Sequence, residues 1–145
     1  MKVDITTETV IGRSRGDVSK YAADPTNAPE WYANIDSVNW KTQPPVGVGS
    51  RMTFVARFLG RRLEYMYEIV EYVPGERLVM RTAEGPFAME TTYAWEDSSP
   101  GETRMTLRNR GEPSGFAAIT APVMAAAMRR ANLKDLARLK KILEK

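Results

Sequence analysis

Apolar and polar residues alternate along much of the chain up to Gly111, which is the pattern of half-buried β-strands. Residues 3–11 are rich in Thr and β-branched side chains and predict the first strand. The alternation resumes near Asp36 and continues through strands that are separated by turns containing Gly or Pro. Consecutive strands with tight turns predict an antiparallel sheet of about seven strands, with one solvent-exposed face and one buried face.

Two short helices are predicted between the first strand and the rest of the sheet. Ser14 is placed to cap a helix over residues 15–23. The pair Asp24-Pro25 ends this helix, because the residue before a proline avoids the helical region. Residues 26–32 then predict a second short helix, which carries the pair Trp31-Tyr32.

The end of the chain predicts one long helix over residues 116–144, in which Pro122 either lies in a first turn capped by Thr120 or marks a kink. Its first half is built from Ala and Met, and its second half carries Leu, Lys and Arg. At 100° per residue, one side of the helix carries the small and apolar residues and Asn132. These residues are Ala121, Met124, Ala125, Met128, Asn132, Leu136, Leu139 and Leu143. The fold class is therefore α+β, and we expect residues 1–145 to form a single domain.

Composition excludes several kinds of chemistry. The sequence contains no His and no Cys, so a Ser-His-Asp triad, a cysteine nucleophile and zinc sites built on imidazole or thiolate are excluded. We expect no metal and no cofactor. The N-terminus lacks the apolar segment of a signal peptide and no run of residues is long and apolar enough to span a membrane, so we expect a cytoplasmic protein.

Aromatic, Met and Asn side chains on the predicted inner faces are the candidate ligand-binding residues. Such residues usually fill a core, but small Ala side chains on the helix face the sheet and Met packs adaptably. We therefore predict an apolar cavity between the sheet and the C-terminal helix. The candidates are Trp31, Phe54, Phe58, Tyr65, Tyr67, Met80, Met89, Tyr93, Met105, Asn109, Met124, Met128 and Asn132.

Asn109 and Asn132 are the polar candidates in this set, because a buried amide needs hydrogen-bond partners. Each would bond either to nearby backbone and water or, with the tyrosines, to a carbonyl or hydroxyl group of a ligand.

The charged residues have simpler interpretations. Four glutamates on outward faces are predicted to be solvated cross-strand partners of Arg57, Arg62 and Arg81. They are Glu64, Glu68, Glu90 and Glu96. A basic cluster on the helix indicates a solvated face rather than a surface for RNA or an anionic membrane, since it lacks interleaved aromatic residues. Asp135 and Glu144 interrupt that cluster, which comprises Arg129, Arg130, Lys134, Arg138, Lys140, Lys141 and Lys145.

Several segments also resemble a known family. They are Asp24-Pro25 followed by Trp31, Val48-Gly49-Ser50-Arg51, the run at residues 67–78, Thr103-Arg104-Met105-Thr106-Leu107, and the run at residues 132–140. Together with the order of elements they resemble the START-like (SRPBCC) superfamily and, within it, the polyketide cyclase/dehydrase-like branch. The resemblance implies the helix-grip fold, in which a curved seven-stranded antiparallel sheet wraps around a long C-terminal helix and leaves a hydrophobic tunnel.

What the resemblance implies about function is less specific, because one fold hosts many activities. We expect a carrier or sensor for a small hydrophobic or aromatic ligand, such as a lipid or a polyketide-like molecule, and we favour a non-catalytic protein. One alternative is a cyclase, aromatase or dehydratase that uses no metal. Another is a partner-binding module of the chaperone or toxin type. No nucleic acid is expected as a partner, and the chain is expected to be a monomer or a homodimer.

Overall fold

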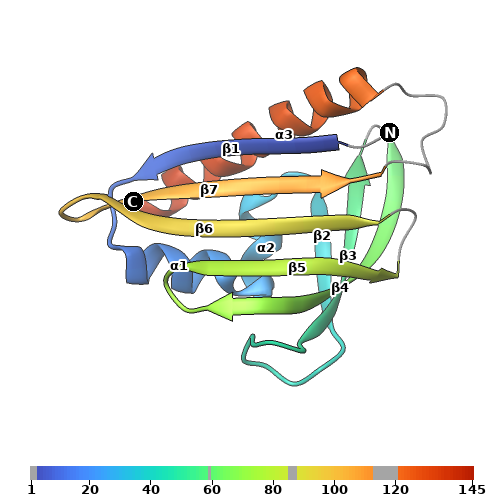
Figure 1. The fold of residues 1–145 in the computed structure, drawn as a ribbon, viewed down its shortest axis with the longest axis horizontal. Helices are drawn as coiled ribbons and strands as arrows, with labels where there is room; N and C mark the ends of the chain where they lie inside the picture. Colours follow the sequence, from blue (N-terminus) through green and yellow to red (C-terminus); the bar gives the residue numbers. More distant parts are fainter. Residues whose placement is uncertain (1–2, 59, 85–87, 113–120) are drawn as a thin grey trace.

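Seven antiparallel strands form one sheet, and the long C-terminal helix lies along one edge of it (Figure 1). The computed structural model describes residues 3–58, 60–84, 88–112 and 121–145, without the side chains of Phe58, Glu84 and Ala121. The elements in chain order are β1 Val3–Ile11, α1 Arg15–Ala23, the 3-10 turn η1 Pro25–Asn27, α2 Ala28–Trp31, β2 Ile35–Trp40, β3 Arg51–Phe58, β4 Arg61–Val73, β5 Arg77–Glu84, β6 Met89–Ser99, β7 Glu102–Gly111 and α3 Ala121–Leu143.

The strand order is β1-β7-β6-β5-β4-β3-β2, so the first and second strands form the two edges of the sheet. All neighbouring strands pair antiparallel, as the alternating pattern predicts. The predicted faces are also correct on β7, where Met105, Leu107 and Asn109 are buried. Gly75 and Gly101 turn the chain between strands with positive φ angles of 80° and 76°, which glycine adopts without steric cost.

The two short helices begin and end near the predicted residues. The Ser14 hydroxyl accepts a hydrogen bond from the Asp17 backbone N–H at 3.3 Å and caps α1, as expected. The predicted second helix over residues 26–32 is divided, because η1 precedes α2 and the carboxylate of Asp24 caps the turn by accepting from the Thr26 N–H. Tyr32 then leaves the helix with an extended backbone.

The α3 helix presents its predicted apolar stripe to the core, where Met124, Leu136 and Leu139 are fully buried. Two of its cations contact the edge strand β1, because Arg129 and Lys140 donate to the carbonyl oxygens of Thr6 and Val10, at 3.3 and 2.7 Å. The predicted start of this helix at residues 116–120, with its Thr120 cap, lies outside the described residues. In the described part of the chain, no helix combines the length and apolar character needed to cross a membrane.

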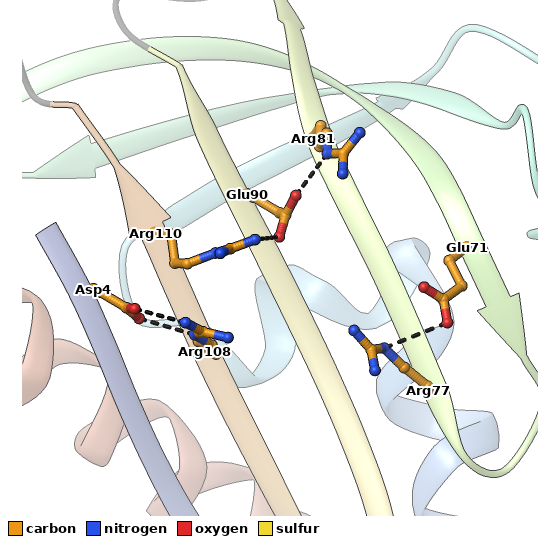
Figure 2. A network of polar contacts seen from close by, with 7 residues as sticks. All are labelled: Asp4, Glu71, Arg77, Arg81, Glu90, Arg108 and Arg110. Carbon is orange, nitrogen blue, oxygen red and sulfur yellow. Dashed lines mark hydrogen bonds and ion pairs between the residues drawn. The ribbon is translucent and has the colours of Figure 1, made fainter. Parts of the chain in front are cut away.

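The face of the sheet that points away from the helices carries pairs of opposite charges, as predicted (Figure 2). Arg108 bonds Asp4 with two nitrogens, at 2.6 and 2.9 Å, and Glu90 lies between Arg81 and Arg110 and bonds both. One predicted partner is different, since Arg57 pairs with Asp36 rather than with a glutamate. Exposed pairs of this kind contribute at most about 1 kcal/mol each, so the buried face supplies most of the stability.

Candidate functional site

A cavity of about 150 Å³ lies between the buried face of the sheet, the middle of α3 and the loop that follows α2. Nine of the predicted side chains line it, and they come from β3 through β7 and from α3. They are Phe54, Tyr65, Tyr67, Met80, Met89, Tyr93, Asn109, Met128 and Asn132. The sequence pattern therefore brings most of the candidate residues to one place.

Three other predicted residues are not among the described residues that line the cavity. Trp31, Met105 and Met124 are fully buried and pack in the core. The side chain of Phe58 lies outside the described part of the structure. Trp31 nevertheless borders the site, because its ring packs on those of Tyr32 and Tyr93, with centroids 4.1 and 5.7 Å apart.

The register of the strands explains why these inward-facing side chains lie at similar positions along neighbouring strands. Phe54 lies opposite Tyr65 across β3 and β4, and Thr91 lies opposite both Met80 and Asn109 in its neighbouring strands. Alternation predicts which face each residue occupies, but the level along the strand depends on the register. Met105 lies four residues before Asn109 on the same face, and its place opposite Trp95 takes it away from this level.

Several lining residues were not predicted from the sequence. They are Tyr32, Asn34, Ile35, Ala56, Arg57, Leu63, Thr91, Ala131 and Asp135. Leu63 and Thr91 continue the apolar faces of their strands, so periodicity was an available signal for them. Tyr32, Asn34 and Ile35 follow the end of α2, where the backbone direction is not evident from the sequence.

The hydroxyl groups of Tyr32 and Tyr93 form a hydrogen-bonded pair at the cavity, with their oxygens 2.6 Å apart. Burial raises the pKa of both groups well above the ordinary value for tyrosine, and it raises the pKa of Tyr67 to about 12. These tyrosines therefore stay protonated near neutral pH. They can donate or accept a hydrogen bond, but they are not bases under these conditions.

The two asparagines differ in their hydrogen bonding. Asn109 accepts a hydrogen bond from the Thr91 hydroxyl at 2.7 Å, so its carbonyl oxygen is occupied. Asn132 is only 6% exposed, and its Nδ2 has no hydrogen-bond partner among the described residues. A buried amide nitrogen without a partner costs about 1–3 kcal/mol. Asn132 is therefore a lining residue with a buried, unused donor.

Asp135 is the buried acid of the site, and the sequence pattern misplaced it in the basic solvated face of the helix. It is 2% exposed, and its Oδ1 accepts a hydrogen bond from the Ala33 backbone N–H at 3.0 Å. Burial raises the pKa of its carboxyl group to about 6, although that hydrogen bond and the charges of Arg138 and Lys134 act in the opposite direction. Its spacing gave a usable signal, because it lies three residues after Asn132 and seven after Met128.

The site therefore combines an apolar interior with a few polar groups that lie toward α2 and α3. In the described part of the chain, no group of three or more carboxylates is placed to hold a metal ion. Arg57 also borders the cavity, but its side chain is exposed and its guanidinium forms an ion pair with the carboxylate of Asp36 at 2.9 Å. Such an arrangement suits an apolar molecule that carries one or two oxygen atoms.

Comparison with known proteins identifies the fold. Residues 2–144 match the family described as polyketide cyclase / dehydrase and lipid transport. No curated protein matches the chain in sequence.

Three solved structures are similar to this chain over nearly its whole length. A protein of Thermus thermophilus has a TM-score of 0.82 at 19% identity and covers 97% of this chain and 96% of its own. The Zhui aromatase/cyclase from a Streptomyces species has a TM-score of 0.80 at 13% identity, with 99% and 94% covered. A START superfamily protein from Mycobacterium smegmatis has a TM-score of 0.72 at 15% identity, with 97% and 94% covered. The predicted helix-grip fold and START-like resemblance are confirmed.

Proposed function

Because the chain belongs to the polyketide cyclase / dehydrase and lipid transport family, we propose that it binds a small apolar molecule in the cavity between the sheet and α3, as a carrier or a sensor. The observation that carries this proposal is the cavity itself, which is lined mainly by aromatic, Met and Ala side chains. A protein interior is normally packed without voids of this size. Such a space at the centre of a folded domain costs stability, and a bound ligand recovers that cost.

The size of the cavity limits the buried part of the ligand. A void of about 150 Å³ with apolar walls accommodates a benzene-sized ring. Met80, Met89 and Met128 line it, and these flexible side chains can adjust to a somewhat larger group. We therefore propose an aromatic or short aliphatic group as the portion that enters the interior.

The proposal predicts that the variant Ala131→Phe no longer binds the ligand. Ala131 lines the cavity from α3, so a phenyl ring at this position occupies the space that the ligand needs. Native mass spectrometry of the freshly purified protein measures the bound fraction, and denaturing extraction identifies what is released. We expect close to one molecule per chain in the natural protein and none in the variant.

Ala137→Phe is the matched control, because Ala137 is an exposed residue on the same helix. It should carry the same molecule as the natural protein, and both variants should unfold cooperatively. Equal loading of the two variants would locate the molecule elsewhere and contradict the proposal. If the natural protein is empty, titration with the neutral probe 4-phenylbutan-1-ol replaces the measurement, and failure of this probe to bind also contradicts the proposal.

A cyclase- or dehydratase-type reaction is the second candidate function, and the position of Asp135 favours it. A carboxyl group with a pKa of about 6 at an apolar cavity is suited to removing a proton next to a ketone near neutral pH. In the protonated Tyr32–Tyr93 pair one hydroxyl donates to the other, and the second hydroxyl is free to donate a hydrogen bond to the ketone oxygen.

This candidate predicts that the protein accelerates exchange of deuterium into the methylene and methyl groups beside the carbonyl of 4-phenyl-2-butanone, followed by NMR. The rate should rise as the pH passes through about 6, because the base is then ionised. Asp135→Asn should lower it by about 100-fold or more, while binding of the ketone persists. An exchange rate that is the same with and without the protein, or unchanged by the substitution, would exclude Asp135 as the base.

A further inference from the structure

A depression on the surface adjoins the cavity between α3 and the loop that follows α2, and we take it as the opening of the cavity. This depression of about 260 Å³ shares Asn34, Ala131 and Asp135 with the lining of the cavity. Ala33 and Ala127 also border this depression, and their small side chains leave room for a ligand to extend outward. A molecule whose ring occupies the cavity would therefore have its other end at this opening.

Two cations without acidic partners border the opening. Arg130 and Lys134 line the depression, and they lie one helical turn apart on the same face of α3. Side chains with this spacing are neighbours, with about 6 Å between their Cβ atoms, so both can reach one anionic group. Within the part of the chain that the structure describes, neither residue forms an ion pair.

The outer face of the sheet is different. There, Arg77, Arg81, Arg108 and Arg110 each bond a carboxylate (Figure 2). Other cations of α3, such as Arg138, Lys141 and Lys145, also lack an ion pair among the described residues, but Arg130 and Lys134 are the two that border the depression. Exposed cations at a concave site attract anions.

Among the described residues that line the depression, Asp135 is the acidic one. The groups around it are Lys134 and Arg138 on α3, the Ala33 N–H, and the hydroxyl groups of Tyr32 and Tyr93. Its carboxyl group is buried, whereas the two cations are exposed. An anionic group at the surface would therefore lie closer to solvent than this carboxyl does, beside the cations.

We propose that the bound molecule is an acidic amphiphile, whose apolar end fills the cavity and whose carboxylate lies at the opening against Arg130 and Lys134. This inference rests on the proposed binding function and adds the chemical class of the ligand. The apolar end accounts for the aromatic lining, and the acidic end accounts for the two unpaired cations at the outer rim.

Two probes that share one skeleton test the inference by isothermal titration calorimetry. The anion 4-phenylbutyrate and the neutral 4-phenylbutan-1-ol place the same ring in the cavity and differ at the end that reaches the opening. The natural protein should bind the acid about fivefold more tightly than the alcohol, since exposed ion pairs contribute about 0.2–1 kcal/mol each. The preference should shrink between about 20 mM and 500 mM salt, because salt screens exposed charges.

The double variant Arg130→Ala/Lys134→Ala should bind the two probes equally, with its affinity for the alcohol unchanged. Lys141→Ala/Lys145→Ala removes the same charge from exposed positions nearer the end of the chain and should keep the preference for the acid. Equal affinities in the natural protein, or a preference that survives in the first double variant, would overturn the inference and leave the binding function intact. Failure of both probes to bind would instead contradict the proposed function.

Discussion

Replacement of Trp31 by alanine is expected to lower the free energy of unfolding by about 3–5 kcal/mol, the range for a fully buried aromatic side chain. Trp31 has no exposed surface, and its ring packs on those of Tyr32 and Tyr93. The substitution leaves a void directly behind the two tyrosines, and their rings lose the surface that holds them at the cavity. Ligand affinity should therefore fall together with stability, and both are measured on the same samples by urea denaturation and calorimetry.

Trp31→Phe separates the packing of the ring from its polar atom. The indole Nε1 of Trp31 is buried and has no hydrogen-bond partner among the described residues, so phenylalanine removes an unsatisfied donor and keeps an aromatic ring. We expect a loss well below that of the alanine variant. Trp40→Ala serves as a comparison, because Trp40 is half-buried and its Nε1 bonds the Thr26 hydroxyl. If Trp31→Ala lowers the free energy of unfolding no more than Trp40→Ala does, Trp31 is not the residue whose packing supports Tyr32 and Tyr93 at the cavity.

Asp135→Asn is expected to stabilise the protein by about 3 kcal/mol at pH 8 and to have little effect at pH 4. The pKa of this carboxyl group is about 6 in the folded protein and 3.8 in its ordinary state. A raised pKa means that the native state favours the protonated form, so this contribution to stability is fully present below about pH 4 and is lost as the pH rises through about 6. Each unit of difference corresponds to about 1.4 kcal/mol, and asparagine can still accept the hydrogen bond from the Ala33 N–H.

Urea denaturation of the natural protein and the variant at several pH values measures this difference directly. Subtraction of the two curves removes the contributions of acids whose pKa is lowered, such as Asp4 and Glu90. Asp97→Asn is a matched control, because Asp97 is exposed and pairs with Arg15 at 3.4 Å, so its effect should stay within about 0.5 kcal/mol. A stabilisation of equal size at pH 4 and pH 8 would show that the charge of Asp135 is not its cause.

Much of the fold could be predicted because it depends on local patterns. Alternation on β7 places Leu107 and Asn109 on the inner face, the Ser14 cap marks the start of α1, and the apolar stripe of α3 identifies its buried side. The division of the second short helix was missed, since a single turn of η1 and the exit at Tyr32 depend on tertiary packing rather than on periodicity.

The candidate site could be predicted only in part, because residue type indicates burial and not depth along a strand. Met89 and Met105 are both inward methionines, yet register brings only Met89 to the cavity. Asp135 was assigned to solvent since charged residues are rarely buried without a partner. Its position within the stripe was the stronger signal, and a backbone N–H from the loop after α2 supplies the partner that the sequence does not reveal.

The contacts of Arg129 and Lys140 with β1 have a consequence for the behaviour of this protein in concentrated solution. An edge strand presents unpaired backbone groups, which form a template for the strand of another molecule. Here two long side chains from α3 occupy carbonyl oxygens of that strand, at Thr6 and Val10. The helix that lines the cavity thus also covers part of the exposed edge of the first strand. Two of the basic residues of α3 are therefore expected to reduce aggregation through the edge strand, and this effect does not depend on a ligand.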